Sequence, residues 1–175
     1  IKLPEAGRYA VGNIFLPTGY DTRQGQQILE RAVVSEGLEL LGWRDVPVDN
    51  STIGVTARSV EPVIKQVFVG AGPDVKDQLA FERRLYCVRK RTAWGIRRAG
   101  LNDNNENFYA CSLSSKTLIY KGQLMAPQLE TYYLDLLDPD MVSALALAHS
   151  RYSTNTFPSW GRAQPFRYIA HNGEI

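Results

Sequence analysis

Residues 8–17 read RYAVGNIFLP, an apolar run that ends at Pro17. A short run of this kind, closed by a proline, predicts a buried strand. The surrounding chain continues with periodic segments that can be assigned in the same way. The predicted segments are a helix from 21 or 22 to 35 that Gly37 stops, a strand at 38–48, a loop at 49–62, a strand at 64–69, a helix that starts at Asp74 or Asp77, a loop at 100–107, and a hairpin of 108–112 with 117–120.

These elements follow the order strand, helix, strand, strand, helix, strand within residues 1–112, an order shared by ferredoxin-like modules. The last strand could equally belong to a larger sheet. Residues 113–175 add a short helix at 126–132, an apolar strand at 141–149 and a strand at 166–170. The sequence therefore predicts an α+β protein.

Composition excludes several classes of protein. The chain has 175 residues, 44% of them apolar and 22% charged, with a net charge of +2, so it is neither disordered nor a coiled coil. Its longest uncharged run is twelve residues, whereas a membrane-spanning helix needs about 20. Two cysteines suit a reducing compartment, and we expect a cytoplasmic protein without a membrane or nucleic-acid partner.

Metal and nucleotide motifs are missing from the sequence. The only cysteines and histidines are Cys87, Cys111, His149 and His171, and no pair has a chelating spacing. There is no G-x-S-x-G elbow, P-loop or G-x-G-x-x-G. We therefore expect no metal in this chain.

The predicted second helix carries the chain's basic cluster, which consists of Arg83, Arg84, Arg89, Lys90, Arg91, Arg97 and Arg98. Such a cluster is either a solvated face of a packed helix or a surface for an anionic partner. The spacing alone leaves both interpretations open.

Residues 149–174, HSRYSTNTFPSWGRAQPFRYIAHNGE, concentrate polar groups directly after an apolar stretch. Arg151 can offer a fork of donors to a carboxylate, and Asn172 with Gly173 can offer a side-chain and a backbone N–H to an oxyanion. An arginine here could also form a surface salt bridge, and Asn-Gly could form a β-turn. Residue chemistry alone therefore indicates a binding site without deciding it.

The segment AHSRYSTNTFPSWGRAQPFRYIAHNGEI resembles the glutaminase domain of the large (alpha) subunits of glutamate synthases. LELLGWRDVPVD, IKQVFVG, FERRLYCVRKR and FYACSLSSKTLIYKGQLMAPQL resemble the same family in the same order, so the resemblance covers nearly the whole chain. It implies one class II glutamine amidotransferase domain, with a substrate-pocket portion at 113–175. The implied fold is the N-terminal-nucleophile hydrolase type, a four-layer α/β/β/α sandwich, here incomplete at both ends.

The resemblance also implies an activity. In this family an N-terminal cysteine attacks the side-chain amide of glutamine, which releases ammonia and leaves a thioester that water hydrolyses. The ammonia travels to the remaining synthase domains, where it adds to 2-oxoglutarate. FMN and an iron–sulfur cluster there supply electrons for glutamate synthesis, with a small NAD(P)H-oxidising subunit as a further partner in some members.

The resemblance assigns roles to four residues. Arg151 matches the arginine that binds the glutamine α-carboxylate, Thr154 matches a residue of the same pocket, and Asn172 and Gly173 match the oxyanion hole. The nucleophilic cysteine is expected before residue 1, and an aspartate that binds the α-amino group is expected after residue 175. The 175 residues alone are therefore expected to be inactive.

Two alternatives remain at this point. Another class II amidotransferase, such as one that makes phosphoribosylamine, glucosamine 6-phosphate or asparagine, would not explain the FPSW and AQPFR segments. A non-catalytic βαββαβ binding module would leave residues 149–174 unexplained. The electron donor, whether NADPH, NADH or ferredoxin, has its determinants outside this sequence.

Overall fold

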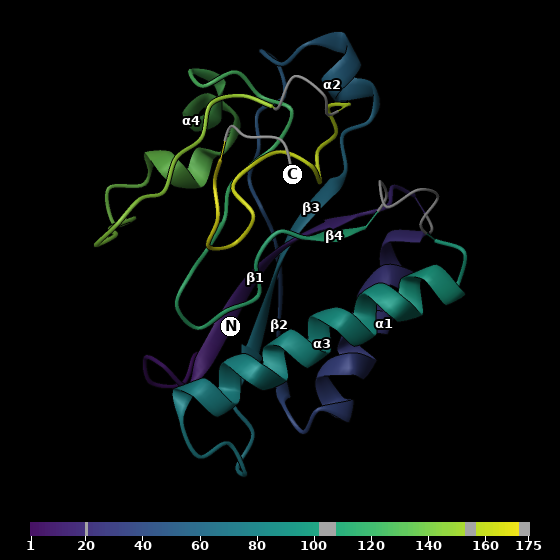
Figure 1. Cartoon of the computed structure of the whole chain (residues 1–175), viewed down its shortest axis with the longest axis vertical. Helices are drawn as coiled ribbons and strands as arrows, with labels where there is room; N and C mark the ends of the chain where they lie inside the picture. Colours follow the sequence, from purple (N-terminus) through teal and green to yellow (C-terminus); the bar gives the residue numbers. More distant parts are fainter. Residues whose placement is uncertain (20, 102–107, 153–156, 172–175) are drawn as a thin grey trace. The chain divides into compact units, whose positions relative to one another are not determined.

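The computed structural model describes residues 1–19, 21–101, 108–152 and 157–171. They form two compact units, which are described separately below (Figure 1). The first unit comprises residues 1–45 and 62–118, and the second comprises residues 46–61 and 119–175. The short segment 46–61 thus belongs with the C-terminal part of the chain.

A four-stranded antiparallel sheet forms the centre of the first unit. Its strands are β1 (Tyr9–Leu16), β2 (Glu39–Asp45), β3 (Val63–Gly70) and β4 (Tyr109–Ala110), in the spatial order β2-β3-β1-β4. Helix α1 (Asp21–Ser35) follows β1, and helix α3 (Gln78–Arg98) follows β3. This is the βαββαβ order predicted from the sequence, and the protein is α+β.

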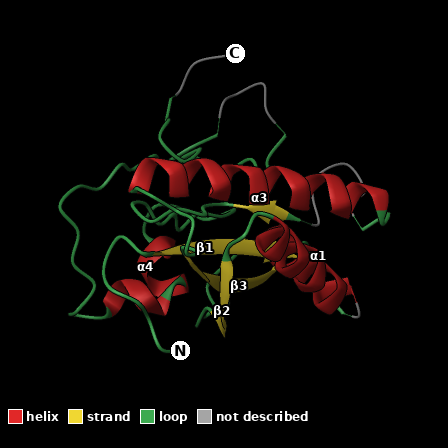
Figure 2. Cartoon of the chain, turned by 90° about the horizontal axis from the view of Figure 1, so that it is seen from below, coloured by secondary structure: helices red, strands yellow, loops and turns green. Residues whose placement is uncertain are grey.

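Both long helices pack on the same face of this sheet, where alternate residues of β1 meet apolar stripes of α1 and α3 (Figure 2). Ile14 and Leu16 of β1 and Leu85 of α3 are each 0% exposed, and Leu29 of α1 is 1% exposed. The periodicity of the predicted helices therefore identified the core side correctly. The other core residues include Ala10, Val33, Val67, Val69, Phe81, Val88 and Ile96.

The helix ends follow local rules. The Asp77 carboxylate accepts a hydrogen bond from the Ala80 N–H at 2.7 Å, so Asp77, rather than Asp74, is the N-cap of α3. Gly37 has φ +67° after the end of α1, and the Leu38 N–H reaches back to the Val33 carbonyl at 3.1 Å. This confirms the predicted glycine stop, because the left-handed conformation is easy only for glycine.

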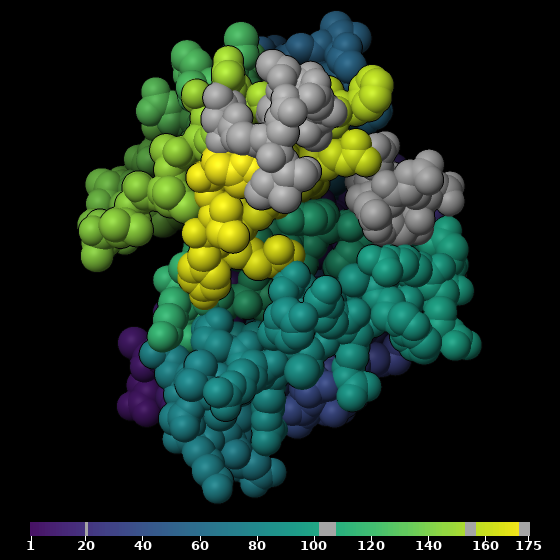
Figure 3. Space-filling model, viewed as in Figure 1, coloured from purple at the N-terminus to yellow at the C-terminus, as the bar shows by residue number. Residues whose placement is uncertain are grey.

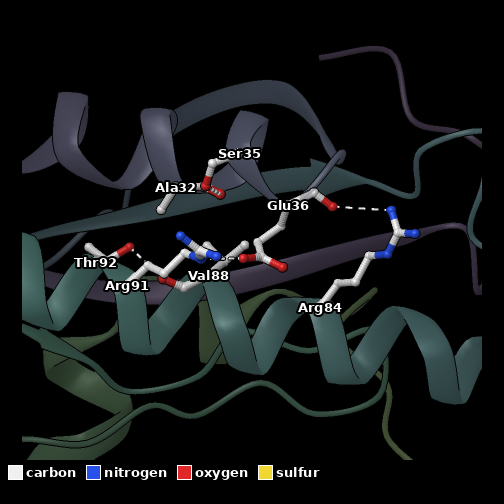
Figure 4. Close-up of polar contacts among 7 residues, drawn as sticks. All are labelled: Ala32, Ser35, Glu36, Arg84, Val88, Arg91 and Thr92. Atoms are coloured by element: carbon white, nitrogen blue, oxygen red, sulfur yellow. Dashed lines mark hydrogen bonds and ion pairs between the residues drawn. The ribbon is translucent and has the colours of Figure 1, made fainter.

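Some of the basic cluster lies between the two helices and some lies on the surface. The Glu36 carboxylate pairs with Arg91, and its backbone carbonyl accepts a hydrogen bond from Arg84 at 3.1 Å (Figure 4). Exposed side chains of α3 form part of the surface in teal in Figure 3. On α3, Arg98 lies 4.8 Å from the ring centroid of exposed Trp94. These contacts give Arg84, Arg91 and Arg98 structural partners within the unit.

The predicted hairpin of 108–112 with 117–120 is wrong. Residues 109–110 instead pair with β1, and Ser114 forms a single bridge with Val11. The Glu82 carboxylate on α3 accepts hydrogen bonds from the Ser114 hydroxyl and from the Ser115 N–H. The segment therefore pairs with the edge of β1 rather than with residues 117–120.

The second unit contains α2 (Val55–Ser59), α4 (Gln128–Tyr132) and the 3-10 helix η1 (Leu134–Leu137). Helix α4 confirms the predicted short helix, whereas α2 lies in the predicted loop at 49–62. The two parts of this unit are joined by backbone hydrogen bonds: Asp49 N–H to the Tyr132 carbonyl at 2.9 Å, and Leu134 N–H to the Pro47 carbonyl at 3.2 Å.

Two apolar segments of the second unit differ from expectation. Residues 141–149 are not a strand, and Val142 and Leu145 are 85% and 82% exposed. Residues 166–170 form only a tight turn, in which Phe166 and Ile169 exchange two backbone hydrogen bonds and Arg167 has φ +58°. Apolar composition alone therefore overestimated strand content here. No helix in the described part of the chain has the length and apolarity needed to cross a membrane.

Candidate functional site

The predicted site residues fall in the second unit. The Arg151 side chain is exposed. Thr154, Asn172 and Gly173 lie outside the described residues, so the roles assigned to all four stay predictions. What the structure does describe is the segment that joins them, residues 157–171, and the contacts that hold this segment in place.

Trp160 anchors the segment. Its side chain is 3% exposed, and its indole Nε1 donates a hydrogen bond to the Ala57 carbonyl of α2 at 3.0 Å. Its ring lies 5.4 Å from the Tyr132 ring, centroid to centroid. Gly122 allows this position, because a Cβ there would lie 2.4 Å from Cζ3 of the indole. The indole is thus fixed by shape as well as by a hydrogen bond.

A tyrosine cluster supports Trp160. The Tyr132 hydroxyl donates to the Glu61 carboxylate at 2.5 Å, and the Tyr133 hydroxyl donates to the Lys121 carbonyl at 2.6 Å. Burial raises the pKa of Tyr132 far above its ordinary value, and the hydrogen bond to Glu61 and its negative charge raise it further. The Tyr132 phenol therefore remains a neutral donor throughout the physiological pH range.

Lys121 is a buried cation, only 2% exposed. Its Nζ donates to the Gly161 carbonyl at 2.8 Å and to the Ala163 carbonyl at 2.7 Å, and it lies 4.7 Å from the centroid of the Phe166 ring. A buried ammonium group needs such partners, because an unsolvated charge is costly. Lys121 is not among the predicted site residues, and its only signal in the sequence is a lysine directly after the apolar run Leu118–Ile119–Tyr120.

Gln164 connects the middle of this segment to its last residue, His171. Its side-chain Nε2 donates to the His171 carbonyl at 2.6 Å, and its Oε1 accepts from the His171 N–H at 2.7 Å. Nearer the start of the segment, the Tyr152 hydroxyl donates to the Ser159 carbonyl at 2.8 Å, and burial raises the pKa of this phenol. The chain on both sides of Trp160 is therefore held by side-chain hydrogen bonds to backbone.

The described part of this segment offers several hydrogen-bond donors. Within the described residues, no three His, Cys, Asp or Glu side chains gather where they could hold a metal ion. Cys87 is exposed on α3, and Cys111 is buried after β4. These residues do not fit an iron–sulfur cluster, which takes four cysteine ligands.

Comparison with known proteins identifies the family. The sequence model of the class-II glutamine amidotransferases matches residues 1–175. The chain is 48% identical over 177 residues to the glutamate synthase [NADPH] large chain of Bacillus subtilis, covering 100% of this chain and 11% of that protein. It is 44% identical over 185 residues to the glutamate synthase [NADH] of Saccharomyces cerevisiae, covering 100% of this chain and 8% of that protein.

A third relative is the ferredoxin-dependent glutamate synthase 1, chloroplastic/mitochondrial, of Arabidopsis thaliana, 45% identical over 169 residues. That match covers 94% of this chain and 10% of the relative. The chain thus spans about a tenth of the length of these curated relatives. Since the family match extends over every residue, the chain belongs to the class-II glutamine amidotransferases.

Proposed function

We propose that this chain is part of the glutamine-hydrolysing domain of a glutamate synthase. The domain would convert glutamine into glutamate and ammonia, and the ammonia would reach 2-oxoglutarate for reductive glutamate synthesis. The observation that carries the proposal is the family match over residues 1–175, together with the three relatives above, which are named glutamate synthases and are 44–48% identical. The activity would serve ammonia assimilation and amino-acid biosynthesis in the cytoplasm.

Four residues would act on glutamine in this proposal. Arg151 binds the α-carboxylate, Thr154 lines the same pocket, and Asn172 and Gly173 stabilise the oxyanion of the tetrahedral intermediate. Support comes from the position of Arg151, whose side chain is exposed on the surface of its unit. The nucleophile would be an N-terminal cysteine outside these 175 residues, because Cys87 lies within α3 and Cys111 follows β4.

The complete domain would have the four-layer α/β/β/α sandwich of N-terminal-nucleophile hydrolases. FMN and an iron–sulfur cluster would belong to the other synthase domains. For the cluster, the two cysteines of this chain are fewer than the four ligands that it takes. Reductive amination of 2-oxoglutarate, in which ammonia replaces the carbonyl oxygen with loss of water and the resulting imine is reduced, would take place there. The names of the three relatives specify different electron donors, namely NADPH, NADH and ferredoxin. The proposal therefore assigns neither an electron donor nor a small NAD(P)H-oxidising subunit.

Paired steady-state kinetics in the complete enzyme test these roles, with glutamine and with ammonium chloride as alternative nitrogen sources. Arg151→Ala should raise the KM for glutamine by about 30-fold or more, since losing a charge-assisted contact costs about 2–5 kcal/mol. Asn172→Ala should lower the turnover of glutamine by about 10²–10³-fold, because its amide is needed most when the carbonyl oxygen becomes negative.

Neither change should reduce glutamate formation from ammonium chloride, which bypasses glutamine hydrolysis. Arg83→Ala is the matched control, because Arg83 is also an exposed arginine but lies on α3 in the first unit. It should leave both activities unchanged. If both activities fall together in folded Arg151 and Asn172 variants, these residues are structural and the assignment is wrong. If the unmodified enzyme does not hydrolyse glutamine at all, the proposed function is wrong.

A further inference from the structure

Two groups of residues on α3 have different surroundings. On the side toward α1, Arg84 donates to the Glu36 carbonyl at 3.1 Å, and Arg91 pairs with the Glu36 carboxylate. A second group recurs at intervals of three or four residues and lies on the side away from the buried stripe of the helix. All of its side chains are exposed. This group, which we call the α3 patch, consists of Tyr86, Lys90, Trp94, Arg97 and the neighbouring Arg98.

Cations and aromatic rings are paired within the α3 patch. The Lys90 ammonium lies 5.8 Å from the centroid of the Tyr86 ring, and the Arg98 guanidinium lies 4.8 Å from that of Trp94. The two rings are nevertheless 53% and 59% exposed. Trp, Tyr and Arg are the residue types that contribute most binding energy at protein interfaces. A guanidinium held over a ring can also bind a carboxylate through its N–H edge, and less conformational entropy is then lost on binding.

The charge of the α3 patch is uncompensated within its own unit. In the described part of the chain, Lys90, Arg97 and Arg98 form no ion pair with a carboxylate. The single acidic residue of α3, Glu82, accepts hydrogen bonds from Ser114 and Ser115 instead. A second copy of the same patch would be repelled, because like charges would face one another. Charge complementarity therefore indicates an acidic partner.

The patch fits an acidic protein surface better than a nucleic acid. Proteins that bind single-stranded nucleic acid stack bases on aromatic rings. Here a cation already lies over each ring, at Tyr86 and at Trp94. The net charge of the chain is only +2, so the positive charge is local and does not form a general phosphate-binding surface. Carboxylates are thus the favoured anions.

We propose that the α3 patch docks an acidic surface of another domain of the same glutamate synthase polypeptide. This inference rests on the proposed function. The chain covers only 8–11% of the curated relatives, so most of such a polypeptide lies outside these 175 residues. A single exposed ion pair contributes at most about 1 kcal/mol. Linked domains need no more than a few such contacts, because their effective concentration is on the order of millimolar.

Zero-length coupling in the complete enzyme tests the proposal. A carbodiimide joins an amine to a carboxyl group only where the two are in direct contact. We expect Lys90 to form an amide with an Asp or Glu outside residues 1–175, in a product that keeps the mass of one polypeptide at every dilution. Lys116, an exposed lysine of the same unit outside the patch, is the control and should give no such product.

Charge reversal beside Lys90 gives the second arm of the test. Arg97→Glu should lower the yield of the Lys90 product at least about tenfold, because it places a negative charge against an acidic surface. Arg97→Gln should lower it less, since it only removes one exposed charge. Arg31→Glu is the matched control: it makes the same charge change at an exposed arginine on α1 in the same unit. It should leave the yield within about twofold of the unmodified enzyme. If Arg97→Glu does not fold, Arg97→Gln decides the test.

Four outcomes would overturn the inference while leaving the proposed function standing. Lys90 gives no product with a carboxyl group outside these 175 residues, or its product joins two polypeptides, which would show an interface between copies. Arg31→Glu lowers the yield as much as Arg97→Glu does. A single-stranded RNA probe binds the complete enzyme with a steep salt dependence that Arg97→Glu removes, which would make the patch an RNA site. Absence of glutamine hydrolysis in the unmodified enzyme would instead contradict the proposed function itself, whatever the coupling shows.

Discussion

Gly122→Ala should destabilise the second unit, because the new methyl group would occupy space that the Trp160 indole fills. A Cβ at residue 122 would lie 2.4 Å from Cζ3 and 2.7 Å from Cε3 of the ring. Ordinary carbon contacts start at about 3.5 Å, so the indole would have to move by about 1 Å. Trp160 is only 3% exposed, so its ring cannot move aside without disturbing the groups packed around it.

The loss of stability expected for Gly122→Ala has two contributions. Forcing extra volume into a packed site costs about 1–3 kcal/mol. Movement of the indole also weakens the 3.0 Å hydrogen bond from its Nε1 to the Ala57 carbonyl, which contributes about 1 kcal/mol. The free energy of unfolding should therefore fall by about 2–4 kcal/mol, the sum of these contributions.

Urea-induced unfolding of this chain, followed by tryptophan fluorescence, measures the change. Gly54→Ala is the control, because residue 54 lies in the same unit and a Cβ added there would have nothing within 4 Å. Its φ of −63° and ψ of 152° are also angles that alanine adopts. The control should change the free energy of unfolding by no more than about 0.5 kcal/mol. Equal stability of the two variants would refute the packing argument.

Two further predictions concern a strand contact and a buried phenol. Gly12→Ala would place a Cβ 2.5 Å from the Ser112 carbonyl oxygen, a backbone atom that cannot rotate away. Because the Cys111 N–H donates a hydrogen bond to β1, hydrogen exchange should show that this amide loses protection in the variant. The raised pKa of Tyr132 means that its contribution to stability is complete below the unfolded-state value of about 10 and is lost as the pH rises above it. An alkaline titration should show that Tyr132 ionises only when the protein unfolds. In Tyr132→Phe, the free energy of unfolding should depend less steeply on pH in the alkaline range. If Tyr132 titrates in the folded protein together with the exposed tyrosines, the prediction is wrong.

The first unit could be predicted from sequence because its signals are local. The spacing of apolar residues identified α1 and α3, and Gly37 marked a helix end that the structure confirms. Pairing of segment 108–112 could not be predicted in the same way, because its partner is β1, almost 100 residues earlier in the chain. Residues 141–149 show the same limit, since an apolar run forms a strand only where a neighbouring strand is available.

The candidate site likewise contains residues that the sequence identifies and residues that it does not. Its chemical groups, Arg151 and the Asn172–Gly173 pair, stand out in the sequence because their residue types suit a carboxylate and an oxyanion. The residues that hold the segment do not stand out. Lys121 reaches it from 40 residues away, and the role of Gln164 depends on a turn that brings His171 back beside it. Such roles depend on tertiary contacts, which spacing does not encode.

The assignment of residues 46–61 to the second unit has a consequence for synthesis of the protein on the ribosome. All strands and long helices of the first unit have emerged once residue 118 is free, but the 46–61 segment must then wait for partners that are translated later. The Ala57 carbonyl meets its indole donor only after 103 further residues have been made. Until then the segment is a loop tethered at both ends by the already paired β2 and β3. A nascent chain paused just after residue 118 has left the ribosome should therefore be cut by a protease within 46–61 while its sheet remains intact.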